Sequence, residues 1–148
     1  MRVVIALTLF LAACAAPPPA DYAQPSHAEA MAAMRAGNAA DAAILRARIA
    51  SDPAEGSWGR LDDEIEADTL ADPEFVKALT VEQCEWVWIE KGELAESSRT
   101  RIGEEPRGAY RCDTRASYDA LGMGTITHTL PGYWYRDPAA GWVFAEIG

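Results

Sequence analysis

The sequence has no apolar run long enough to cross a bilayer as a helix. Its longest run covers residues 3–13, is interrupted only by Thr8, and is soon followed by three prolines at 17–19. A spanning helix needs about 20 apolar residues, roughly twice this length. Because one early cation, Arg2, precedes the run and small residues end it, the pattern predicts a secretory signal at residues 1–13.

Basic residues are also scarce. The chain has 13 Lys and Arg against 23 Asp and Glu, a net charge of −10. Removal of the signal takes Arg2 with it and brings the balance to 12 basic and 23 acidic residues, or −11. We expect no nucleic-acid partner, since affinity for nucleic acid comes largely from Lys and Arg on phosphates. We also expect no flat contact of the domain with an anionic membrane.

The common catalytic and nucleotide-binding signatures are absent. The sequence has no G-x-S-x-G, H-E-x-x-H, P-loop or dinucleotide fingerprint. The acidic run within residues 62–74 lacks the spacing and the turn glycine of a calcium loop, so we interpret it as the solvated face of a helix. We therefore expect no cofactor and no metal site.

The four residues that end the apolar run are informative. Residues 11–14, Leu-Ala-Ala-Cys, resemble the lipobox of bacterial lipoproteins at all four positions. The resemblance implies that Cys14 is lipidated, becomes the first residue after cleavage and holds the protein on a membrane. Ala15, where some lipoproteins carry Asp, implies the outer membrane. The alternative is an ordinary signal peptide cut near Ala13 or Ala16.

This interpretation divides the chain into three segments. Residues 1–13 are the signal peptide, 14–25 are the lipidated cysteine and a proline-rich tether, and 26–148 are one domain. A proline run favours the extended polyproline II conformation, which would stand the domain off the bilayer. With Cys14 used by lipid, Cys84 and Cys112 remain as an even pair. In an oxidising compartment such a pair predicts a disulfide, with two buried thiols as the alternative.

The first half of the domain is predicted to be helical. Ser26 and Glu29 have the spacing of a capping box and begin a helix that runs to residue 50, either unbroken or divided at Gly37. Residues 60–71 form a shorter amphipathic helix.

The inner edge of that second helix is predicted to hold Leu61 and Ile65, with Leu70 as a further candidate. Asp72 and Pro73 then have the pattern of an N-cap followed by proline in the first turn, which predicts another short helix.

From residue 81 the apolar period changes to two. Residues 81–90 predict a strand with Cys84, Trp86 and Trp88 on one face. Apolar residues on its other face suggest that it is central or covered on both sides. Residues 91–106 are polar and hold either a strand near 97–102 or a loop. Residues 109–118 alternate as a strand.

The chain ends in predicted turns and strands. Glycines at 122–124 form a turn, 125–130 form a strand, and a Pro-Gly turn at 131–132 precedes a hairpin of 133–136 with 142–147. The order of elements predicts an α+β domain. Its N-terminal helices pack on an antiparallel meander of about four to five strands.

Four side chains are candidates for binding or chemistry. His128 could act as a base, or could be a hydrogen-bonded histidine on a mostly apolar face. Arg111 and Arg115 could receive a carboxylate or a phosphate-bearing glycan, or could balance the acidic helices. Trp134 belongs to an aromatic strand of which at least one side is expected to be displayed, although aromatic residues also fill strand cores.

A second resemblance concerns the domain. Residues 30–40 look like the first helix of small NTF2-like (SnoaL-type) domains, and residues 132–147 look like their last hairpin. The resemblance implies a curved sheet around helices, often with a pocket. The catalytic Asp and His of the enzymes in that family have no match here, so no site residue is carried over.

The sequence thus leads to two hypotheses. In the first, the protein is an outer-membrane lipoprotein facing the periplasm, attached to the membrane through Cys14. Its disulfide-stapled domain binds an envelope protein or a small ligand without catalysis. In the second, the domain is an NTF2-like small-molecule pocket or an enzyme that uses His128.

Overall fold

The computed structural model describes residues 18, 23–51, 58–102, 107–120 and 124–148. The predicted signal peptide, Cys14, most of the tether and the first two residues of the predicted turn at 122–124 lie outside these ranges.

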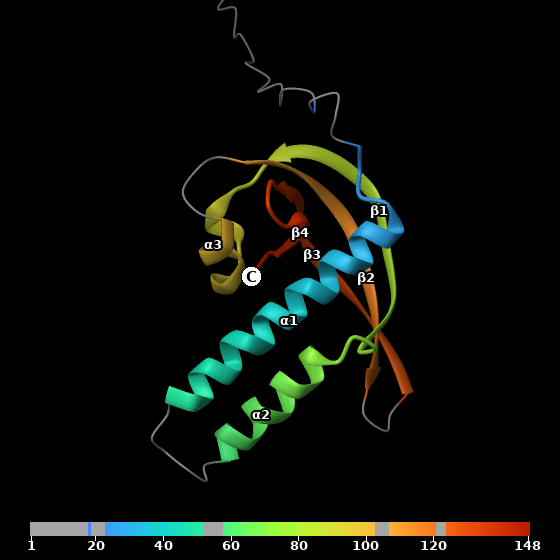
Figure 1. The fold of residues 1–148 in the computed structure, drawn as a ribbon. Helices are drawn as coiled ribbons and strands as arrows, with labels where there is room; N and C mark the ends of the chain where they lie inside the picture. Colours follow the sequence, from blue (N-terminus) through green and yellow to red (C-terminus); the bar gives the residue numbers. More distant parts are fainter. Residues whose placement is uncertain (1–17, 19–22, 52–57, 103–106, 121–123) are drawn as a thin grey trace, which may run out of the picture.

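Two long helices precede a four-stranded antiparallel sheet, with a short helical segment between the first two strands (Figure 1). The elements are α1 (His27–Ser51), α2 (Trp58–Ala71), β1 (Val76–Trp88), the 3-10 turn η1 (Lys91–Glu93), α3 (Glu96–Ile102), β2 (Gly108–Ala120), β3 (Gly124–Asp137) and β4 (Gly141–Glu146). The strands lie in the order β1-β2-β3-β4. The predicted α+β class is confirmed, with four strands.

Helix α1 begins with the predicted capping box. The backbone N–H and the hydroxyl of Ser26 donate to Glu29 Oε2 at 2.9 and 2.7 Å, and Glu29 N–H donates to Ser26 Oγ at 3.3 Å. The helix continues through Gly37 without a break and ends at Ser51. Its buried face is made mostly of small side chains, which allows the helix to lie close to the sheet.

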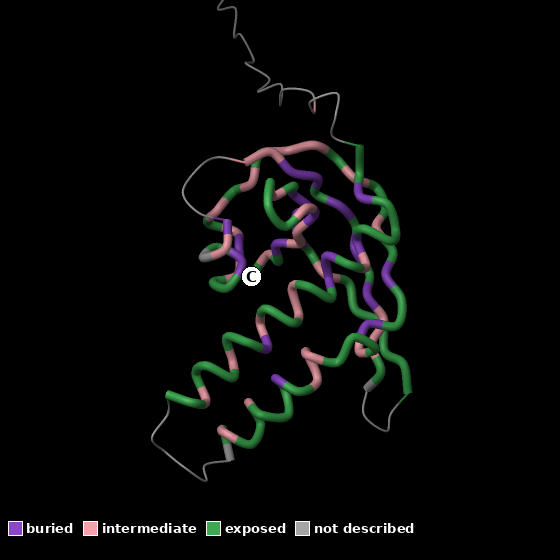
Figure 2. Tube along the Cα trace, viewed as in Figure 1, coloured by how far each residue is buried: buried purple, intermediate pink, exposed green. Residues whose placement is uncertain are grey.

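Helix α2 packs along α1, and its inner face differs from the predicted one. Leu61 and Ile65 are 46% and 48% exposed, whereas Ala67 is buried. The two helices are joined at their surfaces by ion pairs of Arg46 with Asp68 and of Arg48 with Asp63. Figure 2 shows exposed residues along the outer sides of both helices and buried ones along the sheet.

The predicted helix start at Asp72 is wrong. Asp72 Oδ1 accepts the backbone N–H of Glu74 at 2.8 Å, and its carbonyl accepts that of Phe75 at 3.1 Å, so the segment is a turn that leads into β1. Val76 and Leu79 are buried, but on a strand. A register shift between Val76 and Ala78 puts both on the inner face. This bulge produces the three-residue spacing that suggested a helix.

Strand β1 starts earlier than predicted and lies at an edge of the sheet instead of at its centre. A second irregularity, between Glu82 and Glu85, contains Gln83 with a φ of 51°. Beyond it the strand is apolar on both faces, as predicted, and each face packs on its own cluster of buried residues. Trp88 is the exception on this strand, because it is 52% exposed.

The polar segment 91–106 forms neither a strand near 97–102 nor a simple loop in its described part. It holds η1 and α3, which cover the outer edge of β4 (Figure 1). Leu94, Ser98 and Ile102 are buried at intervals of four residues. Ser98 Oγ accepts the backbone N–H of Glu146 at 2.9 Å, which ties α3 to β4.

The predicted turn at 131–132 is also wrong, since β3 runs straight through it. Gly132 is required there for a close approach: a Cβ at this position would overlap the Phe144 ring and lie 2.6 Å from the carbonyl oxygen of Ala145. The final hairpin is as predicted. Asp137 Oδ1 accepts two backbone N–H groups within its loop, and Gly141 has a φ of 78°.

Two apolar clusters hold the layers together, one on each face of the sheet. The first packs under α1, and the second packs under η1 and α3. Trp134 belongs to the first cluster, and Tyr133 and Tyr135 belong to the second. All three are at least 97% buried, so the expectation that this strand displays an aromatic surface is wrong.

Candidate functional site

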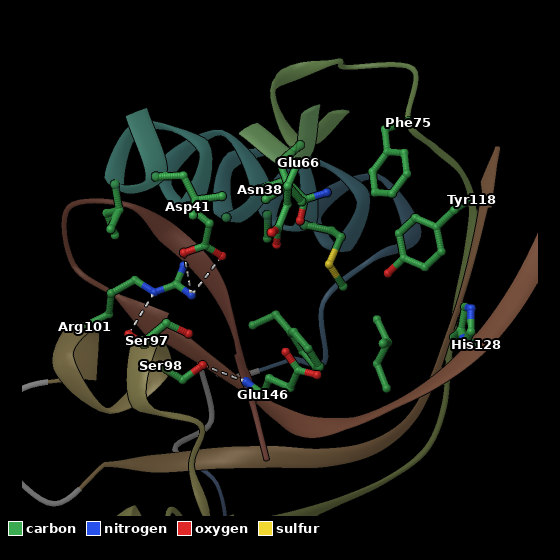
Figure 3. A pocket seen from close by; sticks show the side chains of 18 of the residues that line it. Asn38, Asp41, Glu66, Phe75, Ser97, Ser98, Arg101, Tyr118, His128 and Glu146 are labelled. Atoms are coloured by element: carbon green, nitrogen blue, oxygen red, sulfur yellow. Dashed lines mark hydrogen bonds and ion pairs between the residues drawn. The ribbon is translucent and has the colours of Figure 1, made fainter. Parts of the chain in front are cut away.

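A cavity among the described residues lies between α1 and the inner face of the sheet, with α2 and α3 at its sides (Figure 3). Its volume is about 630 Å³. Pockets that hold small molecules in proteins typically measure about 300–1,000 Å³. The cavity is therefore large enough for a small ligand.

One side of the cavity is apolar and partly aromatic. The rings of Phe75 and Tyr118 lie 4.8 Å apart, centre to centre, where β1 and β2 begin and end. Met34 of α1 and Leu130 of β3 continue this wall. Ile126 lies at the rim and is 40% exposed. The wall can cover the apolar part of a ligand.

The other side is polar. Arg101 of α3 reaches Asp41 of α1, with Nη2 at 3.4 Å from both carboxylate oxygens. Arg101 Nε also donates to the carbonyl of Ser97 at 3.4 Å. Figure 3 shows this pair at one end of the cavity, away from Phe75 and Tyr118. The cavity is thus amphipathic along its length.

Tyr118 offers a neutral hydroxyl to the apolar side. Burial raises the pKa of its phenol above the usual value, and the carboxylate of Glu146 raises it further. A phenol in this state remains protonated at neutral pH, where it can both donate and accept a hydrogen bond.

His128 lines the cavity, as the sequence suggested that it could. Its side chain is exposed, and its ring centre lies 6.2 Å from that of Tyr118. No carboxylate in the described part of the chain forms a hydrogen bond or an ion pair with it. A histidine that acts as a base is normally oriented by such a partner.

The other three candidates lie elsewhere. Trp134 is fully buried, and its indole N–H donates to Thr114 Oγ1 at 2.9 Å. Arg111 and Arg115 are exposed on the opposite face of β2 from the cavity. The Arg111 guanidinium lies 5.8 Å from the centre of the Tyr133 ring.

The disulfide is present. Cys84 and Cys112 are joined with an S–S distance of 2.06 Å and link β1 to its neighbour β2. The bond belongs to the cluster under α1, at the second irregularity of β1. It therefore fixes the edge strand to the rest of the sheet.

Sequence reasoning missed the polar half of the cavity. Asp41, Glu66, Ser98, Arg101 and Glu146 come from four different elements. Asp41 and Arg101 are 60 positions apart, so no local motif connects them. The only signal in the sequence was weak. Ser98 and Ile102 are four positions apart, a spacing that would place both on one face of a short helix.

No group of three or more His, Cys, Asp or Glu side chains in the described ranges is placed to hold a metal ion. Within the same ranges, no helix combines the length and the apolar character needed to cross a membrane.

Comparisons of the chain with protein-family models, with curated proteins and with solved structures find no match.

Proposed function

We propose that this protein is an outer-membrane lipoprotein, held by lipid on Cys14, whose periplasmic domain binds a small amphipathic molecule without catalysis. The observation that carries the binding function is the cavity of about 630 Å³ between α1 and the sheet, apolar at one end and polar at the other. Such an arrangement buries most of a ligand and orients it by a few polar groups.

The anchor rests on the sequence. The match of residues 11–14 to the lipobox supports lipidation, and Ala15 supports the outer membrane. The disulfide fits an exported protein, because structural disulfides persist in oxidising compartments. In cells supplied with labelled palmitate, the wild-type chain is expected to take up label and the Cys14→Ser chain is not. Absence of label from the wild type would contradict the anchor.

Native mass spectrometry of the full chain, released from membranes in mild detergent, tests ligand binding. We expect a stoichiometric extra mass that is lost on gentle activation, whereas lipid on Cys14 is covalent and stays. A chain that is bare in every preparation would contradict the ligand-binding function. A mass that corresponds to a second protein would favour capture of an envelope partner instead.

A catalytic function is the second candidate, because His128 lines the cavity beside Tyr118. The resemblance of residues 30–40 and 132–147 to NTF2-like domains, which often line a pocket, also supports it. If a substrate is found, His128→Ala should abolish turnover in the catalytic case. In the binding case the same change should leave ligand stoichiometry intact.

A further inference from the structure

The charges that line the cavity suggest which molecules it takes. Asp41, Glu66, Asp119 and Glu146 are acidic, and only Arg48 and Arg101 are permanently basic. Four carboxylates against two guanidinium groups leave an excess of two negative charges at the lining. The ion pairs around the cavity show where this excess lies.

Three pairs neutralise most of the charged groups. Arg101 is engaged by Asp41 at 3.4 Å. Arg48 is held by Asp63, which lies outside the lining, at 2.7 Å. Lys77 Nζ lies 3.9 Å from Asp119. These three pairs account for both arginines and for two of the four acids. Both arginines are therefore already paired with a carboxylate, which weakens their attraction for an anionic head group.

Glu66 and Glu146 are the two acidic residues of the lining that these three pairs do not include. In the described part of the chain, no basic side chain forms an ion pair with either of them. Figure 3 shows Glu66 extending from α2 and Glu146 from β4 into the space between α1 and the sheet. Glu146 also acts at a distance on Tyr118, since its charge contributes to the raised pKa of that phenol.

The acidic side chains set the sign of charge that the cavity prefers, and the aromatic wall covers an apolar body. Phe75 and Tyr118 line the cavity with their rings 4.8 Å apart, centre to centre. Two unpaired carboxylates would repel a carboxylate or phosphate head group and attract an ammonium group.

We propose, on the basis of the ligand-binding function above, that the cavity selects amphipathic cations, that is, molecules with a protonated amine and an apolar body. The ammonium group lies between Glu66 and Glu146, and the apolar body lies along Phe75, Tyr118 and Leu130.

Titration calorimetry with three probes of equal chain length tests the proposal. The probes are decylammonium and decanoate, each below its micelle concentration, and decanol below its solubility limit. The protein is the full chain with Cys14→Ser, which keeps all other residues but cannot be lipidated. We expect decylammonium to bind about tenfold more tightly than decanoate, which corresponds to about 1.4 kcal/mol. Added salt should reduce this preference.

A matched pair of variants separates the cavity from the general acidity of the protein. Glu66→Gln with Glu146→Gln should remove the preference for the cation. Asp62→Asn with Glu82→Gln removes the same charge from exposed positions outside the lining and should leave it in place. If both pairs reduce the preference equally, the overall charge is responsible and the proposal is overturned.

The remaining outcomes distinguish the two proposals. Equal binding of all three probes, or tighter binding of decanoate, overturns the selection of cations and leaves a ligand-binding cavity. Failure of all three probes to bind overturns both.

Discussion

Replacement of Cys84 and Cys112 by alanine in one chain removes the covalent link between β1 and β2. The two residues are 28 positions apart. In the chain-entropy model, closing a loop of that length stabilises the folded state by about 3.5 kcal/mol. Alanine avoids placing a new hydroxyl in the cluster under α1, where Cys112 is buried. We therefore expect the free energy of unfolding to fall by about this amount.

Urea unfolding followed by tryptophan fluorescence is the assay. For a domain of this size, a slope of about 1.5 kcal/mol per molar urea converts the loss into a decrease of about 2 M in the midpoint. Dithiothreitol should shift the wild-type midpoint to that of the double variant and should leave the double variant unchanged. A loss below about 1 kcal/mol, or a wild type insensitive to reductant in urea, would refute the reasoning.

Three further predictions concern the sheet. Gly132→Ala should lower the free energy of unfolding by about 1–3 kcal/mol in urea, because its methyl group has no room in the packed sheet. Thr114→Val should cost about 1–3 kcal/mol in the same assay, since it leaves the buried indole N–H of Trp134 without its acceptor. Burial, and then the hydrogen bond and charge of Glu93, raise the pKa of Tyr133 to about 12. Because the neutral phenol is favoured only in the folded state, Tyr133 should stabilise the fold fully below pH 10 and lose this effect between about pH 10 and 12, as measured by urea midpoints across that range.

Each of these predictions has a matched control. Gly92→Ala adds a methyl group that meets nothing within 4 Å and should be close to neutral. Thr129→Val, the control for Thr114→Val, replaces an exposed threonine of β3 and should be close to neutral. Glu93→Gln should make the alkaline loss of stability smaller and complete it at a lower pH, because it lowers the pKa of Tyr133 in the folded state only, whereas Glu96→Gln should not. The assignments would be contradicted if the control variants lowered the free energy of unfolding as much as the test variants. They would also be contradicted if the loss of stability above pH 10 were the same with and without Glu93.

Local patterns were sufficient to predict much of the fold. The capping box at Ser26 and Glu29, the alternation of residues 109–118 and the loop at 137–141 each depend on residues close in sequence. The structure confirms all three. The disulfide was predicted from a count of cysteines: once Cys14 is assigned to lipid, two cysteines are left to pair. These features require no knowledge of how the layers pack.

The wrong predictions arose where tertiary packing, and not the local sequence, decides the role of a residue. Val76 and Leu79 have helical spacing because a bulge separates them on a strand. Gly132 follows a proline, as in a turn, but serves the close approach of the Phe144 ring. Leu61 and Ile65 are apolar, yet α2 turns the side with Ala67 toward α1.

The candidate site was less accessible to sequence reasoning than the fold. His128 was identified and does line the cavity. The pair of Asp41 and Arg101 joins two helices, and the two residues are 60 positions apart in the sequence. That no basic side chain in the described ranges pairs with Glu66 becomes evident only once the neighbouring cations are located. Trp134 drew attention as an aromatic residue, although its partner Thr114 lies beside it in the core.

The irregular edge of the sheet affects how copies of the protein behave when they are crowded together. β1 has one unpaired side, and such edges can pair with the edges of other molecules. Here two register shifts break the ladder, and Lys77, Glu82 and Glu85 are exposed along it. Proteins held on a membrane by lipid, as we propose for this one, meet each other at high local density. A bulged and charged edge prevents neighbouring copies from joining their sheets into an extended aggregate.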